Sequence, residues 1–140
     1  MMLKDILIKA LNQDCTDELQ AIVQYMVDHM MGEGMTGSNV FETFKSHALS
    51  EMKHYERLAE RVIHLGGVPA TSVGPFRKTG TPKEMIEKAL GGERKAIRQY
   101  REHIALAAKH DDPATQLLLE EILSEEEKHA HQLESLIEGE

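Results

Sequence analysis

Glu18-Leu-Gln-Ala-Ile-Val-Gln-Tyr25 returns later in the chain as Glu93-Arg-Lys-Ala-Ile-Arg-Gln-Tyr100. A second motif, Glu51-Met-Lys-His54, returns as Glu126-Glu-Lys-His129. Both repeats have the same offset of 75 residues (93 − 18 and 126 − 51). Each half of the chain therefore carries one Glu, a second Glu 33 residues later and a His three residues beyond that. The repeat indicates two equivalent halves.

Four long helical patterns carry these motifs, and we predict an all-α fold. Apolar residues recur at helical spacing over about residues 3–32, 39–65, 82–110 and 113–138. The stretch between the second and third patterns, residues 66–81, is rich in Gly and Pro. About 15 extended residues reach roughly 50 Å, whereas a hairpin between neighbouring helices needs only about two to eight. The sequence therefore predicts a four-helix bundle whose second and third helices run parallel, joined by a long crossover.

Length and composition favour one globular helical domain spanning residues 1–140. Apolar residues make up 41% of the chain and aromatic residues 4%, which suits helices more than sheets. The net charge of −8 argues against a nucleic-acid partner, which needs a basic surface. Cys15 is the only cysteine, so a disulfide within the chain and a Cys-rich metal module are excluded. No stretch approaches the length of a membrane span, and we expect a cytoplasmic protein without a membrane partner.

The repeated Glu and His residues lie in the apolar stripes of the four predicted helices, where side chains face the core. Burying four carboxylates unpaired would cost roughly several kcal/mol each. One Glu from each of two helices and a Glu-x-x-His from each of the other two form the ligand set of a di-metal site in a bundle. Two divalent ions would neutralise the four carboxylates, and one imidazole per metal among oxygen ligands suits iron or manganese. The predicted metal ligands are Glu18, Glu51, His54, Glu93, Glu126 and His129.

Two alternatives to a metal site fit the same pattern. One is an internal ion-pair network with Lys53, Lys128 or Arg98, although these residues fall off the core stripes. The other is a structural bundle without metal. We interpret the glutamates outside the repeat, Glu125 among them, as solvated surface residues.

Tyr25 and Tyr100 each lie seven residues past a predicted ligand, on the same helix face. We expect them to hydrogen-bond a carboxylate of the site. A one-electron role in oxygen reduction and plain core packing are the alternatives. His47, one turn before Glu51, is interpreted as an ordinary, partly buried histidine, with a ligand for incoming iron as the alternative.

The chain resembles the ferritin-like di-iron carboxylate superfamily, and most closely the bacterioferritins. The resemblance covers nearly the whole chain and is carried by Glu18-Leu-x-Ala-Ile-x-Gln-Tyr25, Glu51-Met-Lys-His54 and the stretch from Glu60 to Pro69. It implies a ferroxidase centre with two iron ions per subunit, built from the six ligands named above. In the family pattern Glu51 and Glu126 bridge the metals, and Glu18 and Glu93 are terminal ligands.

Met52 is the second point of resemblance. In bacterioferritins a Met beside the bridging Glu binds haem b at a two-fold subunit interface, so Met52 is a candidate haem ligand, with simple packing as the alternative. A second apolar stripe on the first helix suggests a homodimer through the first and second helices, and a larger cage is the alternative. That stripe is Ile8, Cys15, Leu19, Ile22, Met26 and Met30.

Three departures separate the chain from the bacterioferritin pattern. It stops about where the fourth helix should end, so we expect a short form that lacks the family's fifth helix. Ser46 and Ser50 stand where bacterioferritins can carry a His and an Asp that bind iron inside the cage. Tyr100 is closer to rubrerythrins, but these place a further Glu where the chain has Ala96, and they carry Cys-rich modules.

Three functions follow from these observations. The first is a ferroxidase that oxidises iron(II) with oxygen or hydrogen peroxide, for iron storage and detoxification. The second is a fixed-cofactor di-iron peroxidase or oxidase of the rubrerythrin type. The third is a haem-bridged dimer for electron transfer, which depends on Met52.

Overall fold

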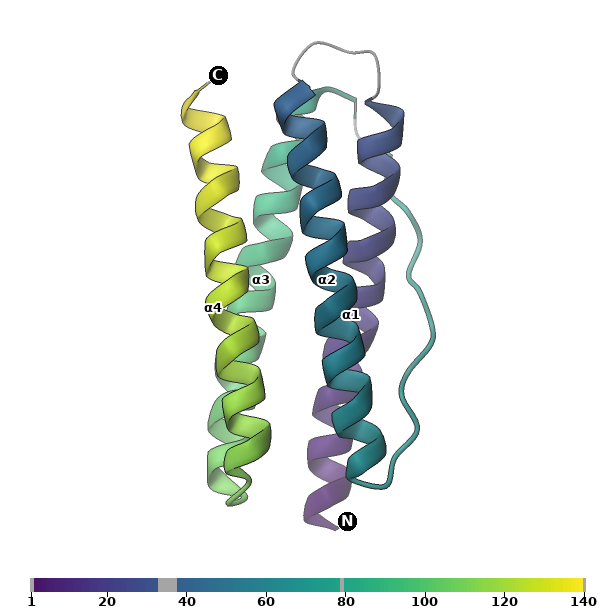
Figure 1. Ribbon diagram of the computed structural model, residues 1–140, viewed down its shortest axis with the longest axis vertical. Helices are drawn as coiled ribbons and strands as arrows, with labels where there is room; N and C mark the ends of the chain where they lie inside the picture. The colour runs from purple at the N-terminus through teal and green to yellow at the C-terminus, as the bar shows by residue number, and fades with distance from the viewer. Residues whose placement is uncertain (1, 33–37, 79, 140) are drawn as a thin grey trace.

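The computed structural model describes residues 2–32, 38–78 and 80–139, and within these ranges the chain is all helix and loop, without a strand. Figure 1 shows the four-helix bundle. Its helices are α1 (Leu3–Met31), α2 (Ser38–His64), α3 (Pro82–Lys109) and α4 (Pro113–Glu138). These bounds differ from the expected ones by at most one residue. The predicted all-α bundle is confirmed.

The starts of α3 and α4 are fixed by the same local device. Thr81 Oγ1 accepts a hydrogen bond from the Glu84 backbone N–H at 3.2 Å, and Asp112 Oδ1 accepts one from the Thr115 N–H at 3.0 Å. Each cap is followed by a Pro at the start of the helix, where the missing N–H carries no penalty. A cap of this kind contributes about 1 kcal/mol. Together they set where each helix begins, and hence the height of its ligands.

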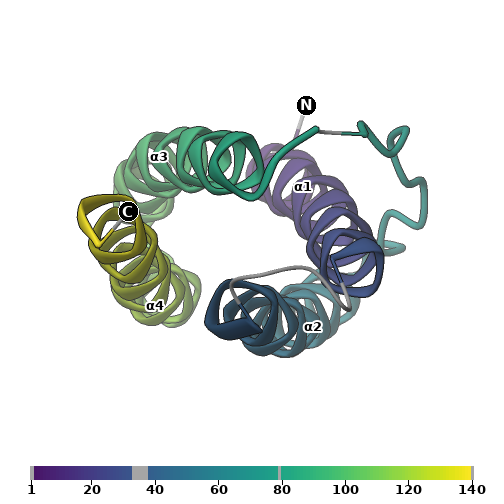
Figure 2. The ribbon, with the colours of Figure 1, turned by 90° about the horizontal axis from the view of Figure 1, so that it is seen from above.

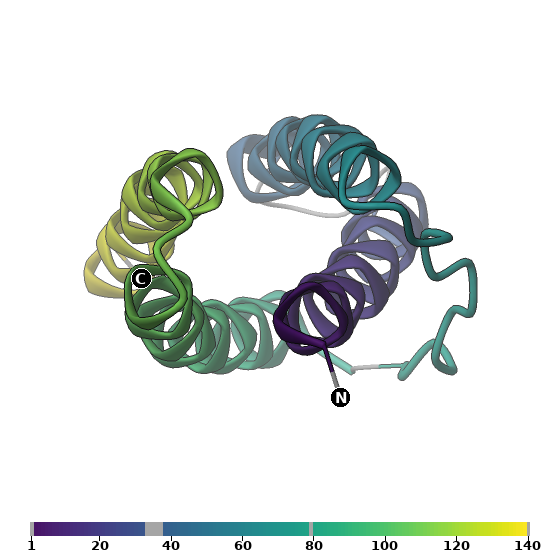
Figure 3. The same ribbon diagram turned by 90° about the horizontal axis from the view of Figure 1, so that it is seen from below.

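The helices form two antiparallel pairs, α1 with α2 and α3 with α4, as Figure 1 shows. The crossover from α2 to α3 returns along the length of the bundle, so α2 and α3 run parallel as predicted (Figure 1). Seen from either end, the helices close into a ring in which the crossover lies outside α1 (Figures 2 and 3). This ring encloses the space where the two halves of the repeat meet.

Side-chain amides of α1 hold the crossover in place. Asn12 Nδ2 donates to the Val68 carbonyl at 3.0 Å, and Gln20 Nε2 donates to the Pro75 carbonyl at 2.9 Å. Gln24 binds the backbone of residue 77 in both directions, at 2.8 and 3.0 Å. Backbone groups of the crossover, which have no helical hydrogen-bond partners, are thus satisfied by side chains of α1.

The apolar core is divided into two clusters along the bundle. One surrounds Phe44, Ile86 and Leu133, and the other surrounds Leu58 and Ile122. All five side chains are fully buried, and each contributes roughly 1.5–3 kcal/mol by leaving water. On α4, the layer between Ile122 and Leu133 holds buried polar side chains instead. The bundle is therefore closed at both ends and polar in the middle.

The outer surface differs between the two helix pairs. Met30 on α1 and Leu49, Met52 and Ile63 on α2 are large apolar side chains that are about half exposed. The outward residues of α3 include Arg94, Lys95, Arg98 and Arg101. Among the described residues, the helices lack a stretch long and apolar enough to cross a membrane. Cys15, which we expected in the outer apolar stripe of α1, is instead fully buried in the core, and the dimer through α1 and α2 stays a prediction.

Candidate metal centre

The six predicted ligands converge in the polar middle layer. They form two overlapping groups, in each of which one ligand atom per residue lies within 4.8 Å of the others. The groups are Glu18, Glu51, His54 and Glu126, and Glu51, Glu93, Glu126 and His129. Glu51 and Glu126 belong to both groups. This is the arrangement expected if these two carboxylates lie between two metal ions.

Each helix pair contributes three of the six residues. Within a helix, the spacing of three residues places His54 Nδ1 3.0 Å from Glu51 Oε1 and His129 Nδ1 3.1 Å from Glu126 Oε1. α1 and α3 each add one Glu from the facing side. We call the α1–α2 set and the α3–α4 set the two half-sites.

The fit to metal ions rests on atoms that lack a partner. All six side chains are buried, and each has one nitrogen or oxygen that lies close to the others but forms no hydrogen bond of acceptable geometry among the described residues. These atoms are Glu18 Oε2, Glu51 Oε1, His54 Nδ1, Glu93 Oε2, Glu126 Oε1 and His129 Nδ1. An unpartnered buried polar atom costs about 1–3 kcal/mol, and six of them facing one layer form a ready set of ligands.

The rival ion-pair network finds no support in the described chain. Lys53, Lys128 and Arg98 are exposed, and none of them forms an ion pair within the described ranges. The carboxylates of the middle layer are therefore not neutralised by neighbouring Lys or Arg side chains.

Burial and mutual repulsion shape the titration of the carboxylates. Burial, with the charge of Glu126, raises the pKa of Glu18 to about 7. Burial likewise raises the pKa of Glu93 to about 7, and burial with two neighbouring carboxylates raises the pKa of Glu51 well above its usual range. Burial also acts on Glu126, but close contacts with both imidazoles outweigh it and lower the pKa of Glu126. The cluster thus needs positive charge to ionise fully.

The imidazoles supply that charge when no metal is bound. Burial opposes protonation of His129, but its contacts with Glu126 and Glu93 raise its pKa to about 9. Contacts with Glu126, Glu18 and Glu51 raise the pKa of His54 further. Metal binding must displace these protons, because a ligating imidazole is neutral.

Two tyrosines tie the half-sites together crosswise. Tyr25 of α1 donates to Glu93 Oε1 of α3 at 2.7 Å. Tyr100 of α3 donates to Glu18 Oε1 of α1 at 2.6 Å. Each tyrosine therefore holds the glutamate that α1 or α3 contributes to the opposite half-site and leaves that glutamate's other oxygen free. The sequence predicted a bond to a carboxylate but not this exchange.

The two imidazoles are supported differently, which the sequence analysis did not predict. His54 Nε2 bonds to Glu125 Oε2 at 2.7 Å, so Glu125 is not the purely solvated residue that we expected. The ring of His129 instead stacks on His47, with centroids 4.1 Å apart. His47 is 1% exposed and so is fully rather than partly buried. These contacts depend on how α2 faces α4, and a one-helix pattern does not contain that information.

A pocket of about 500 Å³ leads to the layer from the side of α1 and α3. Its lining includes Glu18, Glu51, Glu93 and Glu126 but not His54 or His129. Gly91 and Gly92 of α3 also line it, and a Cβ at either would meet nothing within 4 Å. The centre is thus approached on its carboxylate side.

The comparisons with known proteins agree with this architecture. Residues 8–139 match the family model described as a ferritin-like domain. The bacterioferritin of Mycobacterium leprae is 30% identical over 129 residues, which are 91% of this chain and 81% of that one. The chain belongs to the ferritin-like family, as a relative of the bacterioferritins. The bacterioferritin of Rhodobacter capsulatus is 30% identical over 131 residues, 93% of this chain and 81% of that one.

Solved structures place the chain in the same family. The R. capsulatus bacterioferritin, solved with a metal-free dinuclear site and its haem iron in a crystallographic special position, superposes with a TM-score of 0.90 at 29% identity. It covers 96% of this chain and 84% of that one. Mycobacterium tuberculosis BfrA gives a TM-score of 0.88 at 28% identity over 94% of this chain and 84% of that one. The expected likeness to bacterioferritin is confirmed.

Proposed function

We propose that this protein is a bacterioferritin-like ferroxidase that takes up and oxidises iron(II) for iron storage and detoxification. The observation that carries the proposal is the convergence of six unpartnered, buried ligand atoms in two groups that share Glu51 and Glu126. The four carboxylates balance the charge of two divalent ions. Oxygen ligands with one imidazole per ion suit iron, and manganese is the alternative.

The chain's own residues would have two tasks in this reaction. Glu51 and Glu126 would hold both ions, and Tyr25 and Tyr100 would orient Glu93 and Glu18. Bound iron supplies the electrons: two iron(II) ions give two electrons to oxygen, which leaves with two protons as hydrogen peroxide. Peroxide is the alternative oxidant and is reduced to water. The pocket on the carboxylate side admits these small reactants.

The test is stepwise iron oxidation by the metal-free protein. We expect fast oxidation of two iron(II) ions per subunit, followed by slower turnover. Glu51→Ala should abolish the fast phase, whereas Glu60→Ala, an exposed glutamate of the same helix, should leave it intact. Equal fast phases in both variants would sink the proposal.

A fixed-cofactor peroxidase is the second candidate, favoured by the symmetric pair of tyrosine–glutamate bonds. It predicts catalytic removal of hydrogen peroxide by an enzyme that retains its iron through many turnovers. Release of the oxidised iron during each cycle would instead support ferroxidase and storage activity.

Haem b and the homodimer belong to the same proposal. Met52 is 49% exposed on α2, so it is free to meet a second subunit. We propose a homodimer through this surface in the cytoplasm, able to bind haem between two Met52 side chains. Reconstitution with haem should give a Soret band and a bis-methionine spectrum that Met52→Leu removes. A spectrum unchanged in Met52→Leu would exclude this ligand.

A further inference from the structure

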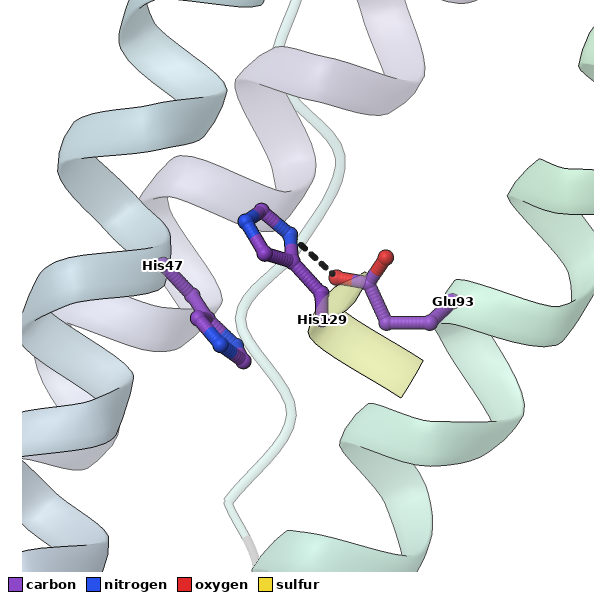
Figure 4. Close-up of side chains that lie close together, drawn as sticks. All are labelled: His47, Glu93 and His129. Atoms are coloured by element: carbon purple, nitrogen blue, oxygen red, sulfur yellow. Dashed lines mark ion pairs between the residues drawn. The ribbon is translucent and has the colours of Figure 1, made fainter. Parts of the chain in front are cut away.

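A third group of ligand atoms lies beside the centre, formed by His47 of α2, Glu93 of α3 and His129 of α4 (Figure 4). One ligand atom of each residue lies within 4.8 Å of the others. His129 Nδ1 and Glu93 Oε1 are 3.5 Å apart. Metal bonds of about 2.0–2.2 Å put the ligand atoms of one ion at most about 4.4 Å apart. The three residues are therefore close enough that small side-chain movements would be needed to hold one ion.

His47 has the features of a metal ligand rather than of a packed core histidine. Its Nε2 is 2.6 Å from Gln132 Oε1, and an amide oxygen can only accept, so Nε2 carries the proton. The other nitrogen, Nδ1, is then a bare lone pair, and it has no hydrogen-bond partner among the described residues. Metal-ligating histidines typically donate their second N–H to an oxygen in this way. The bond from His54 to Glu125 follows the same pattern.

We propose that His47, Glu93 and His129 form a second position for the divalent ion of the α3–α4 half-site. The inference rests on the proposed function, since Glu93 and His129 are also ligands of the proposed pair. Because the positions share these two ligands, one ion occupies one of them at a time. Two imidazoles with one carboxylate suit a divalent transition metal such as iron or cobalt.

The α1–α2 half-site lacks this second position. The residue 75 positions after His47 is Ile122, which is fully buried in the apolar core. The ion beside His54 therefore has one place to sit, and the ion beside His129 has two. The half-sites are equal in their primary ligands and unequal in how they release metal.

The geometry indicates in which direction an ion would move to reach the second position. The rings of His47 and His129 are stacked at 21°, and a metal binds an imidazole nitrogen in the plane of its ring. One of the two rings must therefore turn before His47 Nδ1 and His129 can hold one ion. His47 lies on α2 and Gln132 lies on α4. These two helices are across the bundle from α1 and α3, which line the pocket (Figure 2). The ion would move away from the side on which reactants arrive.

Cobalt(II) tests the inference, because it binds such ligands and does not react with oxygen here as iron does. Crystals of the full chain are loaded with two equivalents and measured at the cobalt absorption edge, and release to EDTA is followed in solution. For the unmodified protein we expect one anomalous peak in the α1–α2 half-site and a divided peak, one part beside His47, in the other. Release should be biphasic, with one ion leaving first.

His47→Leu should merge the divided peak into one and slow the first release phase about tenfold, with the second phase unchanged. His47→Gln keeps a polar side chain at the buried position and should behave alike, which guards against a variant that fails to fold. Ser46→Ala, an exposed neighbour, is the matched control. An undivided peak in the unmodified protein, or a first release phase that neither His47 variant changes, would overturn the inference. Absence of cobalt from both half-sites would overturn the proposed centre as well.

Discussion

The two half-sites have the same kinds of ligand residue but differ in the side chains that support those ligands. In the α1–α2 half-site the carboxylate of Glu125 anchors His54. In the α3–α4 half-site His129 stacks on His47, which is anchored to Gln132. The 75-residue repeat copies the six residues of the proposed centre but neither Glu125 nor His47, whose counterparts are Ser50 and Ile122. The difference teaches that the repeat preserves the charge of the centre and leaves the behaviour of each ion to its surroundings.

Loss of a shared glutamate should have the largest effect, because it should weaken both half-sites and remove the difference between them. Glu126 belongs to both ligand groups, whereas Glu93 belongs to one of the two. Glu126→Ala should therefore lose both ions. The oxidation rate should fall at least about 100-fold, because loss of a residue that only orients a ligand already costs about 10–100-fold. Glu93→Ala should retain the α1–α2 ion. Metal content after gel filtration, together with stopped-flow oxidation, measures both, and two ions in Glu126→Ala would contradict the shared role.

The metal-free protein should become less stable as pH rises. The pKa values of Glu18 and Glu93, both about 7, exceed their unfolded values, so the folded state binds more protons between about pH 4.5 and 7, and stability falls with pH there. The raised pKa of His129, about 9, contributes stability that is fully present below about pH 6.5 and lost towards pH 9.

We expect the free energy of unfolding to drop by on the order of 5–7 kcal/mol from pH 5 to 8. Urea denaturation at several pH values measures it. Glu18→Gln and Glu93→Gln should each remove a similar part of the slope, because the half-sites are alike in this respect. Saturating manganese(II) should abolish the drop, since metal replaces the protons. A flat pH profile for the metal-free protein would rule out the raised pKa values.

Removing the anchor of one imidazole should weaken one half-site alone. Glu125→Ala is expected to lower the metal affinity of the α1–α2 half-site by about 10–100-fold and to leave the other half-site unchanged. Glu121→Ala is the matched control, because Glu121 also links α4 to α2, through Arg57 at 2.7 Å, without touching His54. Calorimetric titration with manganese(II) resolves the two affinities. Equal losses of metal affinity in both half-sites would mean that Glu125 does not act on the α1–α2 half-site alone.

The tyrosine bonds should give the smallest and most equal effects. Tyr25→Phe and Tyr100→Phe each remove one buried hydrogen bond to a glutamate, at a cost of about 0.5–1.5 kcal/mol of stability. Because the bonds cross, Tyr25→Phe should weaken the α3–α4 ion and Tyr100→Phe the α1–α2 ion. Thermal denaturation and metal titration check both points, and a loss confined to the tyrosine's own half would refute the crosswise assignment.

Much of the fold and the convergence of the six Glu and His residues followed from patterns within single helices. The long crossover and the spacing of Glu51 and His54 are local features, and the structure places them as expected. The caps at Thr81 and Asp112 are local features too. Contacts between helices could not be predicted in this way. Whether Glu125 reaches His54 depends on the rotation and height of α4 against α2, which packing of the whole bundle determines.

The crosswise tyrosines have a consequence for how the two hairpins find each other. Each hairpin carries three ligands for the centre and the hydroxyl group that orients the opposite hairpin's glutamate. If the chain were cut in the crossover, neither fragment could complete a metal pair or satisfy its own tyrosine. A divalent ion would then hold the two fragments together, so that adding metal to the two inactive fragments should restore an active protein.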